Sequence, residues 1–311
     1  MKKPINNPTQ QITDWLTLFG STLEQRDFTA AVGLFAADSY WRDLIAFTWN
    51  IKTAEGQADI GAMLTTTVAH NEPSDWCIDG EAVSNGDLTE AWFTFETVVA
   101  RGQGHIRLKE GLCHTLLTAM QELKGFEEKK GRKRVPGIQH VASKNRKNWL
   151  VLRQQEEAEL GYNQQPYCVI IGGGQGGIAL AARLRRLSVP TIIIEKNEQA
   201  GDSWRNRYDS LCLHDQVWQN DLPYLPYPDD WPVFIPKDKM GDWLEVYTKI
   251  MELNLWSSTE CKGASYNEET GTWQVTVERK GEIVVLQPKQ LVLATGMSGM
   301  PKMPDIPGAN T

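Results

Sequence analysis

The sequence predicts an α+β domain at the N-terminal end of the chain, followed by an α/β domain with a parallel sheet. In the first part, residues 1–124, segments with helical periodicity come first and strand-like segments follow. In the second part, residues 166–311, strand-like and helix-like segments alternate around a cluster of glycines. A charged stretch and one helical segment, residues 125–165, separate these parts. We therefore expect two domains joined by a linker.

The composition limits the class of protein. The chain has 311 residues, of which 41% are hydrophobic and 23% charged, as is typical of a soluble globular protein with two domains. A net charge of −7 argues against a general nucleic-acid-binding surface. The five cysteines include no C-x-x-C pair, which argues against a local metal site or a redox-active dithiol. The sequence has neither a signal-peptide pattern nor an apolar run long enough to span a bilayer, so we expect a cytoplasmic protein without a membrane partner.

Three helices and a sheet are predicted in the first domain. From Thr9 onward, apolar residues recur every three or four positions, as in an amphipathic helix: Ile12, Trp15, Leu16, Phe19 and Leu23. Shorter helices are expected at residues 28–35 and 57–68. Aromatic and β-branched residues predict strands at residues 38–50, 91–99, 104–111 and 112–123. Since turn residues separate the later strands, we expect a curved antiparallel sheet.

The segment "LEQRDFTAAVGLFAADSYWRDL" gives the first domain a family resemblance. Residues 9–124 resemble the cone-shaped SnoaL-like fold, which is related to nuclear transport factor two and to polyketide cyclases. The resemblance implies either a scaffold that pairs as a homodimer through its open sheet or a domain with its own ligand pocket. Candidates for such a pocket are Trp41, Arg42, Asp43, Trp49 and His105. We favour the scaffold because no pair of acids or histidines has a spacing that requires acid–base chemistry; Arg42 and Asp43 could equally form a surface ion pair.

The connecting region is charged and contains helix-breaking residues. Its basic run could contact a phosphate or a nucleic acid, but a solvated linker is the simpler interpretation in an acidic protein: Lys129, Lys130, Arg132, Lys133 and Arg134. Asn148 is placed to cap a helix that runs to about Leu160. Gly161 stands where a helix end favours a left-handed residue.

A phosphate-binding turn is predicted between two buried strands. "CVII" at residues 168–171 is followed by Gly172, Gly174 and Gly177 in G-x-G-x-x-G spacing, then by a helix over residues 178–187 and by the strand "TIIIE". Glu195, at the end of that strand, would accept hydrogen bonds from an adenosine ribose and would repel a 2′-phosphate. This pattern predicts a Rossmann-type domain that binds FAD or NAD rather than NADP. The candidate cofactor-binding residues here are Gly172, Gly173, Gly174, Gln175, Gly176, Gly177, Glu195 and Lys196.

The residues after Glu195 resemble the flavin-containing monooxygenases, particularly the plant YUCCA-type branch. The ordered motifs are "GDSWRNRYDSLCLH" (201–214), "LPYLPYP" (222–228), "LEVY" (244–247) and "LVLATG" (291–296) followed by "MPDIPG" (303–308). The resemblance covers residues 166–310 and implies FAD as the cofactor. It places Trp204 and Arg205 near the flavin or its pyrophosphate, with a core role open for Trp204. It also makes Tyr208 and His214 candidates for a flavin-side pocket or for a structural role, and brings the backbone of Thr295 and Gly296 close to the flavin.

The same resemblance implies a reaction. NADPH reduces FAD, dioxygen adds to the reduced flavin, and the resulting hydroperoxide transfers one oxygen atom to a nitrogen or sulfur, or inserts it beside a ketone. No metal and no local catalytic acid or base is predicted, and no catalytic residue is assigned. The alternatives are a flavin-dependent NADPH oxidase or reductase, and a non-catalytic nucleotide- or partner-binding protein. Because a second G-x-G-x-x-G unit and an F-x-G-x-x-x-H motif do not occur in these residues, we expect an N-terminal portion whose NADPH-binding domain lies beyond it.

Overall fold

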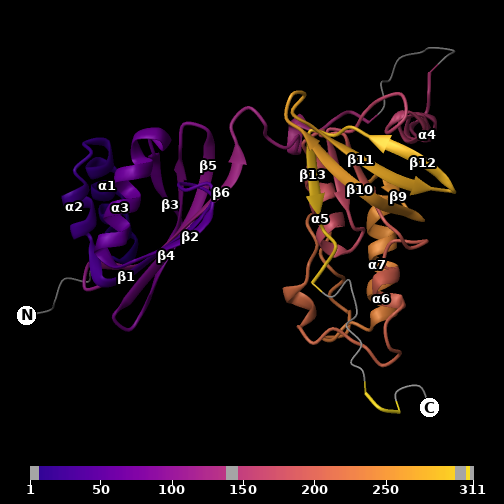
Figure 1. Ribbon diagram of the computed structural model, residues 1–311. Helices are drawn as coiled ribbons and strands as arrows, with labels where there is room; N and C mark the ends of the chain where they lie inside the picture. Colours follow the sequence, from indigo (N-terminus) through magenta and orange to yellow (C-terminus); the bar gives the residue numbers. More distant parts are fainter. Residues whose placement is uncertain (1–6, 138–145, 298–305, 309–311) are drawn as a thin grey trace, which may run out of the picture. The chain divides into compact units, whose positions relative to one another are not determined.

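The computed structural model describes residues 7–137, 146–297 and 306–308, and it divides into two compact units. The first unit comprises residues 1–128 and the second comprises residues 129–311 (Figure 1). The division falls in the charged stretch that follows the last strand of the first unit. In the described part of the chain, none of the helices has both the length and the apolar character needed to cross a membrane.

The first unit contains the three predicted helices. They are α1 (Pro8–Glu24), α2 (Phe28–Gly33) and α3 (Gly56–Asn71). The side chain of Asn7 caps α1 by accepting a hydrogen bond from the backbone N–H of Thr9, and Asp27 caps α2 through the N–H of Ala30. The apolar positions predicted for the first helix are all buried, which confirms its amphipathic pattern: Ile12, Trp15, Leu16, Phe19 and Leu23.

The sheet of the first unit has six strands. They are β1 (Phe35–Leu44), β2 (Ile51–Glu55), β3 (Ser74–Asn85), β4 (Leu88–Glu96), β5 (Ala100–Lys109) and β6 (Leu112–Leu123), in the order β2-β1-β6-β5-β4-β3. The prediction of a wholly antiparallel sheet is wrong for one pair, because β1 and β6 run parallel. The predictions also missed β2 and β3.

The strand predicted at residues 38–50 was too long, and the side chain of Asp43 explains why. Strand β1 ends at Leu44. The buried carboxylate of Asp43 then accepts hydrogen bonds from the backbone N–H groups of Phe47 and Thr48, at 3.1 and 2.8 Å. These bonds turn the chain into a loop before β2. Ile45 in this loop has a positive φ of 58°, a conformation incompatible with a continued strand.

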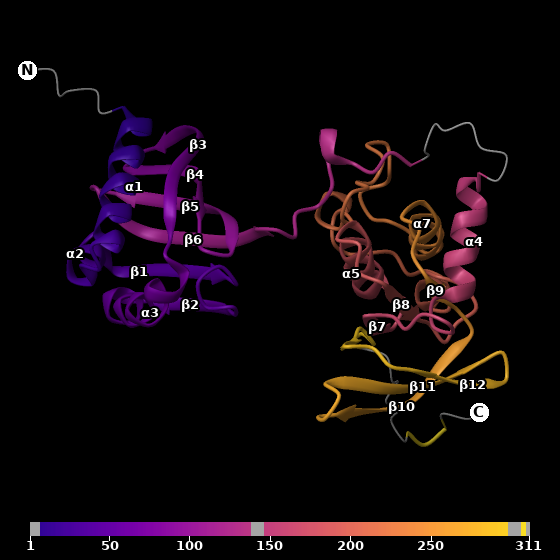
Figure 2. The ribbon, with the colours of Figure 1, turned by 90° about the horizontal axis from the view of Figure 1, so that it is seen from above.

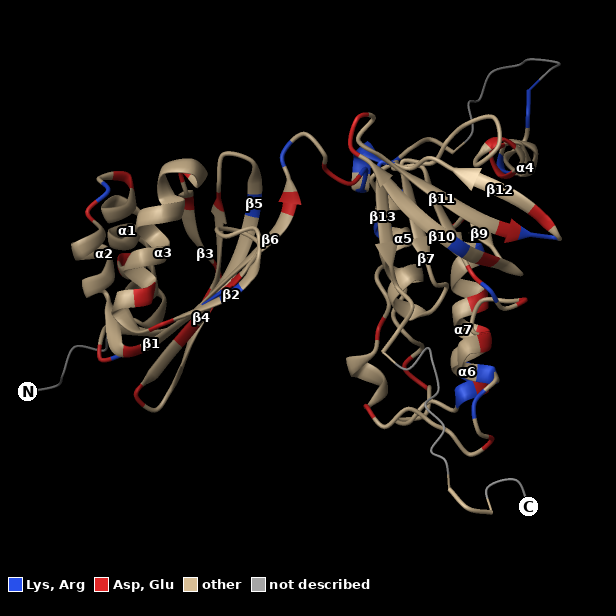
Figure 3. Cartoon of the chain, in the orientation of Figure 1, with Lys and Arg blue, Asp and Glu red and all other residues tan. Residues whose placement is uncertain are grey.

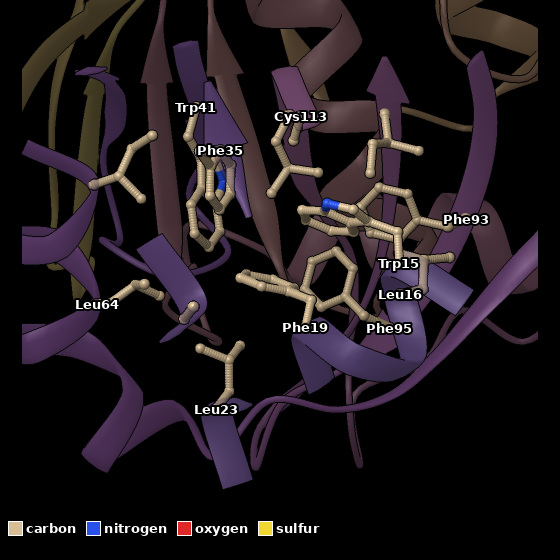
Figure 4. Packing of buried hydrophobic residues seen from close by; sticks show 14 of the residues in the cluster. Trp15, Leu16, Phe19, Leu23, Phe35, Trp41, Leu64, Phe93, Phe95 and Cys113 are labelled. Carbon is tan, nitrogen blue, oxygen red and sulfur yellow. The ribbon is translucent and has the colours of Figure 1, made fainter. Parts of the chain in front are cut away.

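Aromatic side chains fill the space between the helices and the sheet of the first unit. The helices lie on one side of the sheet in Figures 1 and 2. Figure 4 shows the rings of Trp15, Phe19, Phe35 and Trp41 gathered in this core. Trp15 and Phe19 stack with centroids 4.8 Å apart, and Phe19 meets Phe35 edge to face at 5.7 Å. The interior of this unit is therefore packed with its own side chains.

The second unit is built on a parallel sheet of four strands. They are β7 (Cys168–Ile171), β8 (Thr191–Ile194), β9 (Leu255–Trp256) and β13 (Gln290–Leu293), in the order β13-β7-β8-β9. The helices are α4 (Trp149–Glu159), α5 (Gln175–Arg186), α6 (Asp202–Arg205) and α7 (Lys237–Ile250), with short 3-10 turns η1 (Gly131–Lys133) and η2 (Val217–Gln219). Helix α5 begins three residues before the predicted start, at Gln175. This arrangement confirms a Rossmann-type α/β core.

A second sheet in this unit was not predicted. Strands β10 (Thr259–Asn267), β11 (Thr272–Arg279) and β12 (Glu282–Leu286) form an antiparallel meander. Val275, Val277 and Leu286 of the meander are buried with Val169, Ile192 and Ile194 of the parallel sheet. The meander therefore covers one face of the parallel sheet, while α5 and α7 contribute to a separate core that contains Ile170 and Ile193.

Helix α4 is capped as predicted, and ion pairs hold it against the rest of the second unit. Asn148 accepts a hydrogen bond from the N–H of Val151, and Gly161 after the helix has a φ of 91°. The nearly buried guanidinium of Arg153 donates to the carbonyl oxygen of Leu253 at 2.7 Å. Arg185 on α5 pairs with Glu156 and Glu252, at 3.0 and 3.3 Å for its Nη2 atom. Burial raises the pKa of Glu156, but hydrogen bonds from Arg185 and Asn254 outweigh it and leave that pKa below its ordinary value.

Candidate functional site

Three strands bring the predicted cofactor-binding residues to one edge of the parallel sheet. The register pairs Ile171 at the end of β7 with Ile194 of β8 and with Leu293 of β13. The segments that begin with Gly172, Glu195 and Ala294 therefore leave the sheet side by side. Ligands of open α/β sheets bind at this carboxyl edge. The geometry thus brings the glycine turn and Glu195 together with the "ATG" segment.

Three glycines of the turn are required by the packing of the chain itself. Gly172 has a φ of 113°, and a Cβ atom there would clash with the carbonyl oxygen of Ala294. A Cβ on Gly177 would clash with the carbonyl oxygen of Gly172, and one on Gly173 would lie 2.9 Å from Oε2 of Glu195. These contacts let the turn, the helix and the neighbouring strand approach closely.

Gly174 and Gly176 are different, because none of the described residues fills the space beside them. A Cβ on either residue would have no heavy atom within 4 Å. Gly174 has a φ of −76°, which any residue can adopt. The open surface lies at the start of α5, where the backbone N–H groups of the first turn lack helical acceptors and attract anions. The described residues therefore leave the start of α5 open to an anion.

Glu195 is fixed by two backbone hydrogen bonds. The residue as a whole is only 7% exposed. Oε2 accepts from the N–H of Gly173 at 2.7 Å, and Oε1 accepts from the N–H of Asn197 at 2.8 Å. A carboxylate oxygen accepts more than one hydrogen bond, so Glu195 can also hold a ribose hydroxyl. Lys196, the next residue, is exposed.

Trp204 lies beside the glycine turn, whereas Arg205 is held by acidic side chains. Nε1 of Trp204 donates to Oε1 of Gln175 at 3.2 Å. The guanidinium of Arg205 forms ion pairs with Asp202, Asp242 and Glu245 at 3.0, 2.8 and 3.0 Å. Figure 3 shows basic and acidic segments close together at α6 and α7. Burial lowers the pKa of Arg205, but the hydrogen bonds to Asp242 and Asp202 outweigh this effect and raise it.

The remaining candidates of the second unit are exposed. Thr295 and Gly296 follow β13, and Gly296 has a φ of 78°. The backbone nitrogen of Thr295 lies 3.3 Å from where a Cβ on Gly172 would stand, so this segment borders the glycine turn. Tyr208 and His214 are exposed in the loop after α6. Among the hydrogen bonds of the described residues, none joins His214 to the glycine turn. Part of the "MPDIPG" motif, residues 303–305, lies outside the described residues.

The pocket candidates of the first unit do not line one pocket. Trp41 and Asp43 are fully buried in the core, and Thr118 links them, accepting from Trp41 Nε1 and donating to Asp43. Arg42 points to the opposite face of the strand, where it donates to Thr53 at 2.6 Å. The predicted alternative of an Arg42–Asp43 surface ion pair is therefore wrong. Trp49 is exposed in the loop after β1.

His105 lies on the outer face of the sheet, away from the core. It meets Trp92 edge to face with a centroid distance of 4.8 Å. Burial lowers the pKa of His105, although the nearby carboxylate of Glu90 acts in the opposite direction. A hollow of about 390 Å³ on this face is lined by residues of β1, β4, β5 and β6: Tyr40, Arg42, Trp92, His105, Arg107, Thr115, Leu116 and Leu117. Within the described residues, no group of three or more acids, histidines or cysteines is placed to hold a metal ion.

Sequence reasoning missed Lys237, a buried cation beside α6. Its Nζ atom donates to the carbonyl oxygen of Arg205 and to Asp238, both at 2.9 Å. Gly241 was also missed, although it lets α6 approach α7: a Cβ on Gly201 would clash with the carbonyl oxygen of Gly241. The sequence offered little to find Lys237, because a proline before a helix start says nothing about the burial of the residue that follows it.

Comparisons with known proteins cover the second unit. The family described as pyridine nucleotide-disulphide oxidoreductase matches residues 166–311. The indole-3-pyruvate monooxygenase YUCCA1 of Oryza sativa subsp. japonica is 34% identical over 144 residues, which is 46% of this chain and 35% of that protein. The probable indole-3-pyruvate monooxygenase YUCCA9 of Arabidopsis thaliana is 32% identical over 144 residues, 46% of this chain and 34% of that protein.

Among solved structures, a flavin-containing monooxygenase from Stenotrophomonas maltophilia is 23% identical and has a TM-score of 0.40. The likeness covers 45% of this chain and 41% of that one. The chain thus spans about a third of the length of the curated relatives that it matches. Residues 166–311 match an oxidoreductase family model, and the curated relatives of this region are monooxygenases.

Proposed function

We propose that the second unit binds FAD at the glycine turn and that the whole protein is an FAD-dependent monooxygenase that uses NADPH. The observation that carries this proposal is the open space that the described residues leave beside Gly174 and Gly176, next to the fixed carboxylate of Glu195. The oxidoreductase match and the monooxygenase relatives support it. A 2′-phosphate would meet repulsion from Glu195, so FAD fits this turn better than NADPH does.

Each residue of the edge has a role in this proposal. The N–H groups at the start of α5 hold the pyrophosphate, and Glu195 accepts hydrogen bonds from the adenosine ribose. Thr295 and Gly296 bring backbone toward the isoalloxazine side of the cofactor. Bound FAD supplies the redox chemistry, while the chain binds it, orients it and limits the access of water.

The reaction of the whole protein is the transfer of one atom of dioxygen to a small organic substrate. Nitrogen, sulfur or ketone oxygenation are the substrate classes to compare. NADPH oxidation without oxygenated product would instead identify an NADPH oxidase or reductase. Absence of NADPH oxidation in the whole protein, together with ligand binding, would identify a nucleotide- or partner-binding protein.

An absorbance spectrum of the purified chain after addition of FAD and removal of the excess tests the proposal. We expect a bound flavin spectrum that Gly174→Asp abolishes, because the new carboxylate would occupy the pyrophosphate space and repel it. Gly263→Asp is the matched control, since Gly263 in β10 is also an open glycine without a positive φ. A folded chain that remains colourless, or equal loss of flavin in both variants, would contradict the proposal.

We propose that the first unit is a scaffold that pairs two copies of the chain through the outer face of its sheet. The filled core favours a scaffold over an internal ligand pocket. Across the outer face, the register aligns Arg42, Leu117, His105, Trp92 and Asp79 in one row. A second copy turned by 180° would set Arg42 of each copy opposite Asp79 of the other, and the half-exposed Trp92 would be covered.

Light scattering after size-exclusion chromatography tests this pairing. We expect a dimer that Trp92→Glu converts to a monomer, because a charge would be buried at the centre of the interface. Trp218→Glu is the control, since Trp218 is an exposed tryptophan of the second unit. A monomeric wild-type chain, or a dimer in both variants, would contradict the pairing.

A further inference from the structure

Helix α6 links the glycine turn to helix α7. On one side, Nε1 of Trp204 donates to the side chain of Gln175 at 3.2 Å. Gln175 is the first residue of α5 and directly follows the open Gly174. The orientation of α6 therefore decides whether the indole of Trp204 stays beside the proposed pyrophosphate space.

On its other side, α6 is fixed to α7 by Arg205 and by a close backbone approach. The guanidinium of Arg205 reaches Asp242 and Glu245 of α7, and it also bonds to Asp202 and to the carbonyl oxygen of Ala200 within its own segment. These four partners bond to the two Nη groups of Arg205, a residue that the family resemblance placed near the cofactor. Gly201 and Gly241 allow the two helices to touch through their backbones.

Lys237 provides a second contact between α7 and α6, from a position where a lysine is unusual. It is only 5% exposed, and it is the first residue of α7, where the helix dipole disfavours a cation. Burying an ammonium group also costs free energy unless it is well bonded. Its Nζ donates to the carbonyl oxygen of Arg205. Because Arg205 is the last residue of α6, this oxygen accepts no hydrogen bond within the helix. Lys237 thus holds the end of α6 at a cost to the local stability of α7.

We propose that Arg205 and Lys237 are positioning residues that fix α6 so that Trp204 is held against the first turn of α5, beside bound FAD. Arg205 then acts on the cofactor through Trp204 and not by direct contact. The inference rests on the proposed FAD site, but the position of Trp204 is a property of the chain without ligand. The two parts can therefore be tested separately.

The first test follows the indole N–H of Trp204 by ¹H–¹⁵N NMR in the ligand-free chain, with Trp204→Phe to assign the signal. We expect Arg205→Met and Lys237→Met to shift this signal and to speed its hydrogen exchange roughly fivefold, as for loss of one hydrogen bond. Lys239→Met is the control, since Lys239 also lies on α7 but stacks on Trp231 at 4.4 Å. An unchanged Trp204 signal in both variants would overturn the inference.

Gln175→Met covers the case in which the charged variants fail to fold. Gln175 is exposed, so its loss cannot disturb a core, yet it removes the acceptor of the Trp204 hydrogen bond. We expect the same roughly fivefold faster exchange of the indole N–H as in the α6 variants. An unchanged exchange rate would show that Trp204 is not held at this turn, and would overturn the inference.

The second test measures the affinity for FAD in a double-mutant cycle. We expect Arg205→Met and Trp204→Phe each to weaken binding by about tenfold, and the double variant to bind no more weakly than the worse single variant. Additive losses would show that Arg205 acts independently of Trp204 and would overturn the positioning role. A wild-type chain that binds no FAD would overturn the proposed function and the FAD part of the inference, while the NMR result would still decide what holds Trp204.

Discussion

The glycines of strand β5 in the first unit and two glycines of the turn after β7 in the second unit differ in what surrounds them. In the first unit, Gly102 and Gly104 of β5 make room for the rings of Phe95 and Phe93, which would clash with any side chain placed there. In the second unit, Gly174 and Gly176 face space that is open within the part of the chain that the structure describes. Open space alone does not mark a ligand site, because Gly263 in β10 is equally open. Beside Gly174 and Gly176 the open space coincides with the start of α5 and with the fixed carboxylate of Glu195.

The largest effect is expected where a glycine of the first unit accommodates a ring. Gly104→Val would drive a side chain into Phe93 and into the carbonyl oxygen of Leu117. Overpacking of this kind costs roughly 3 kcal/mol or more when the backbone must also move. Urea unfolding followed by near-UV circular dichroism measures the loss. Gly263→Val, at an open position in β10, is the control; equal losses in both variants would contradict the role of Phe93.

A smaller loss is expected at the buried carboxylate of the first unit. Asp43→Ala removes the acceptor for Thr118, Thr48 and the N–H of Phe47, and leaves these donors without a partner. The free energy of unfolding should fall by about 3 kcal/mol, because hydrogen bonds to a buried charged group are stronger than neutral ones. Asp38→Ala, at an exposed position of the same strand, should change it by less than about 0.5 kcal/mol. Similar values for the two variants would show that Asp43 does not organise the loop.

The two kinds of glycine in the turn should separate stability from binding. Gly172→Ala should destabilise the second unit by about 2 kcal/mol, because its φ of 113° and the contact with Ala294 exclude a side chain. Gly174→Ala should leave the stability unchanged to within about 1 kcal/mol, because its φ suits alanine. Its affinity for FAD should nevertheless fall. Thermal unfolding with and without FAD measures both effects, and a strongly destabilised Gly174→Ala would contradict the open space.

The smallest effect concerns the pH dependence of the first unit. Burial lowers the pKa of His105 in the folded state, with Glu90 opposing and Arg107 reinforcing the shift. Just below the ordinary histidine pKa of about 6.5, His105 is therefore protonated to a greater extent in the unfolded chain than in the folded chain. This contribution to stability is present above that pH and is lost on acidification, by under about 1 kcal/mol. His105→Gln should show a smaller decrease in stability between pH 7 and pH 5.5; an unchanged decrease would contradict the shift.

The sequence predicted the features that depend on residues close together in the chain. The turn after β7, the cap at Asn148 and the carboxylate at the end of β8 each follow from short, fixed spacings. The partners of Arg205 could not be predicted, because Asp242 and Glu245 come from a helix much further along the chain. The parallel pairing of β1 with β6 was missed for the same reason. Strand β3 escaped prediction because its polar segment around Gly80 obscures the alternating pattern.

The ion pairs of α4 have a mechanical consequence. A force along the chain from the first unit would reach the parallel sheet of the second unit through α4, because this helix precedes β7 in the chain. In α4, Arg153 bonds to the carbonyl oxygen of Leu253 and Glu156 pairs with Arg185. Both contacts lie away from the carboxyl edge of the sheet. The anchor of α4 therefore lies toward the starts of β8 and β9, at the edge of the sheet opposite the glycine turn, so a force on α4 would act first on that edge.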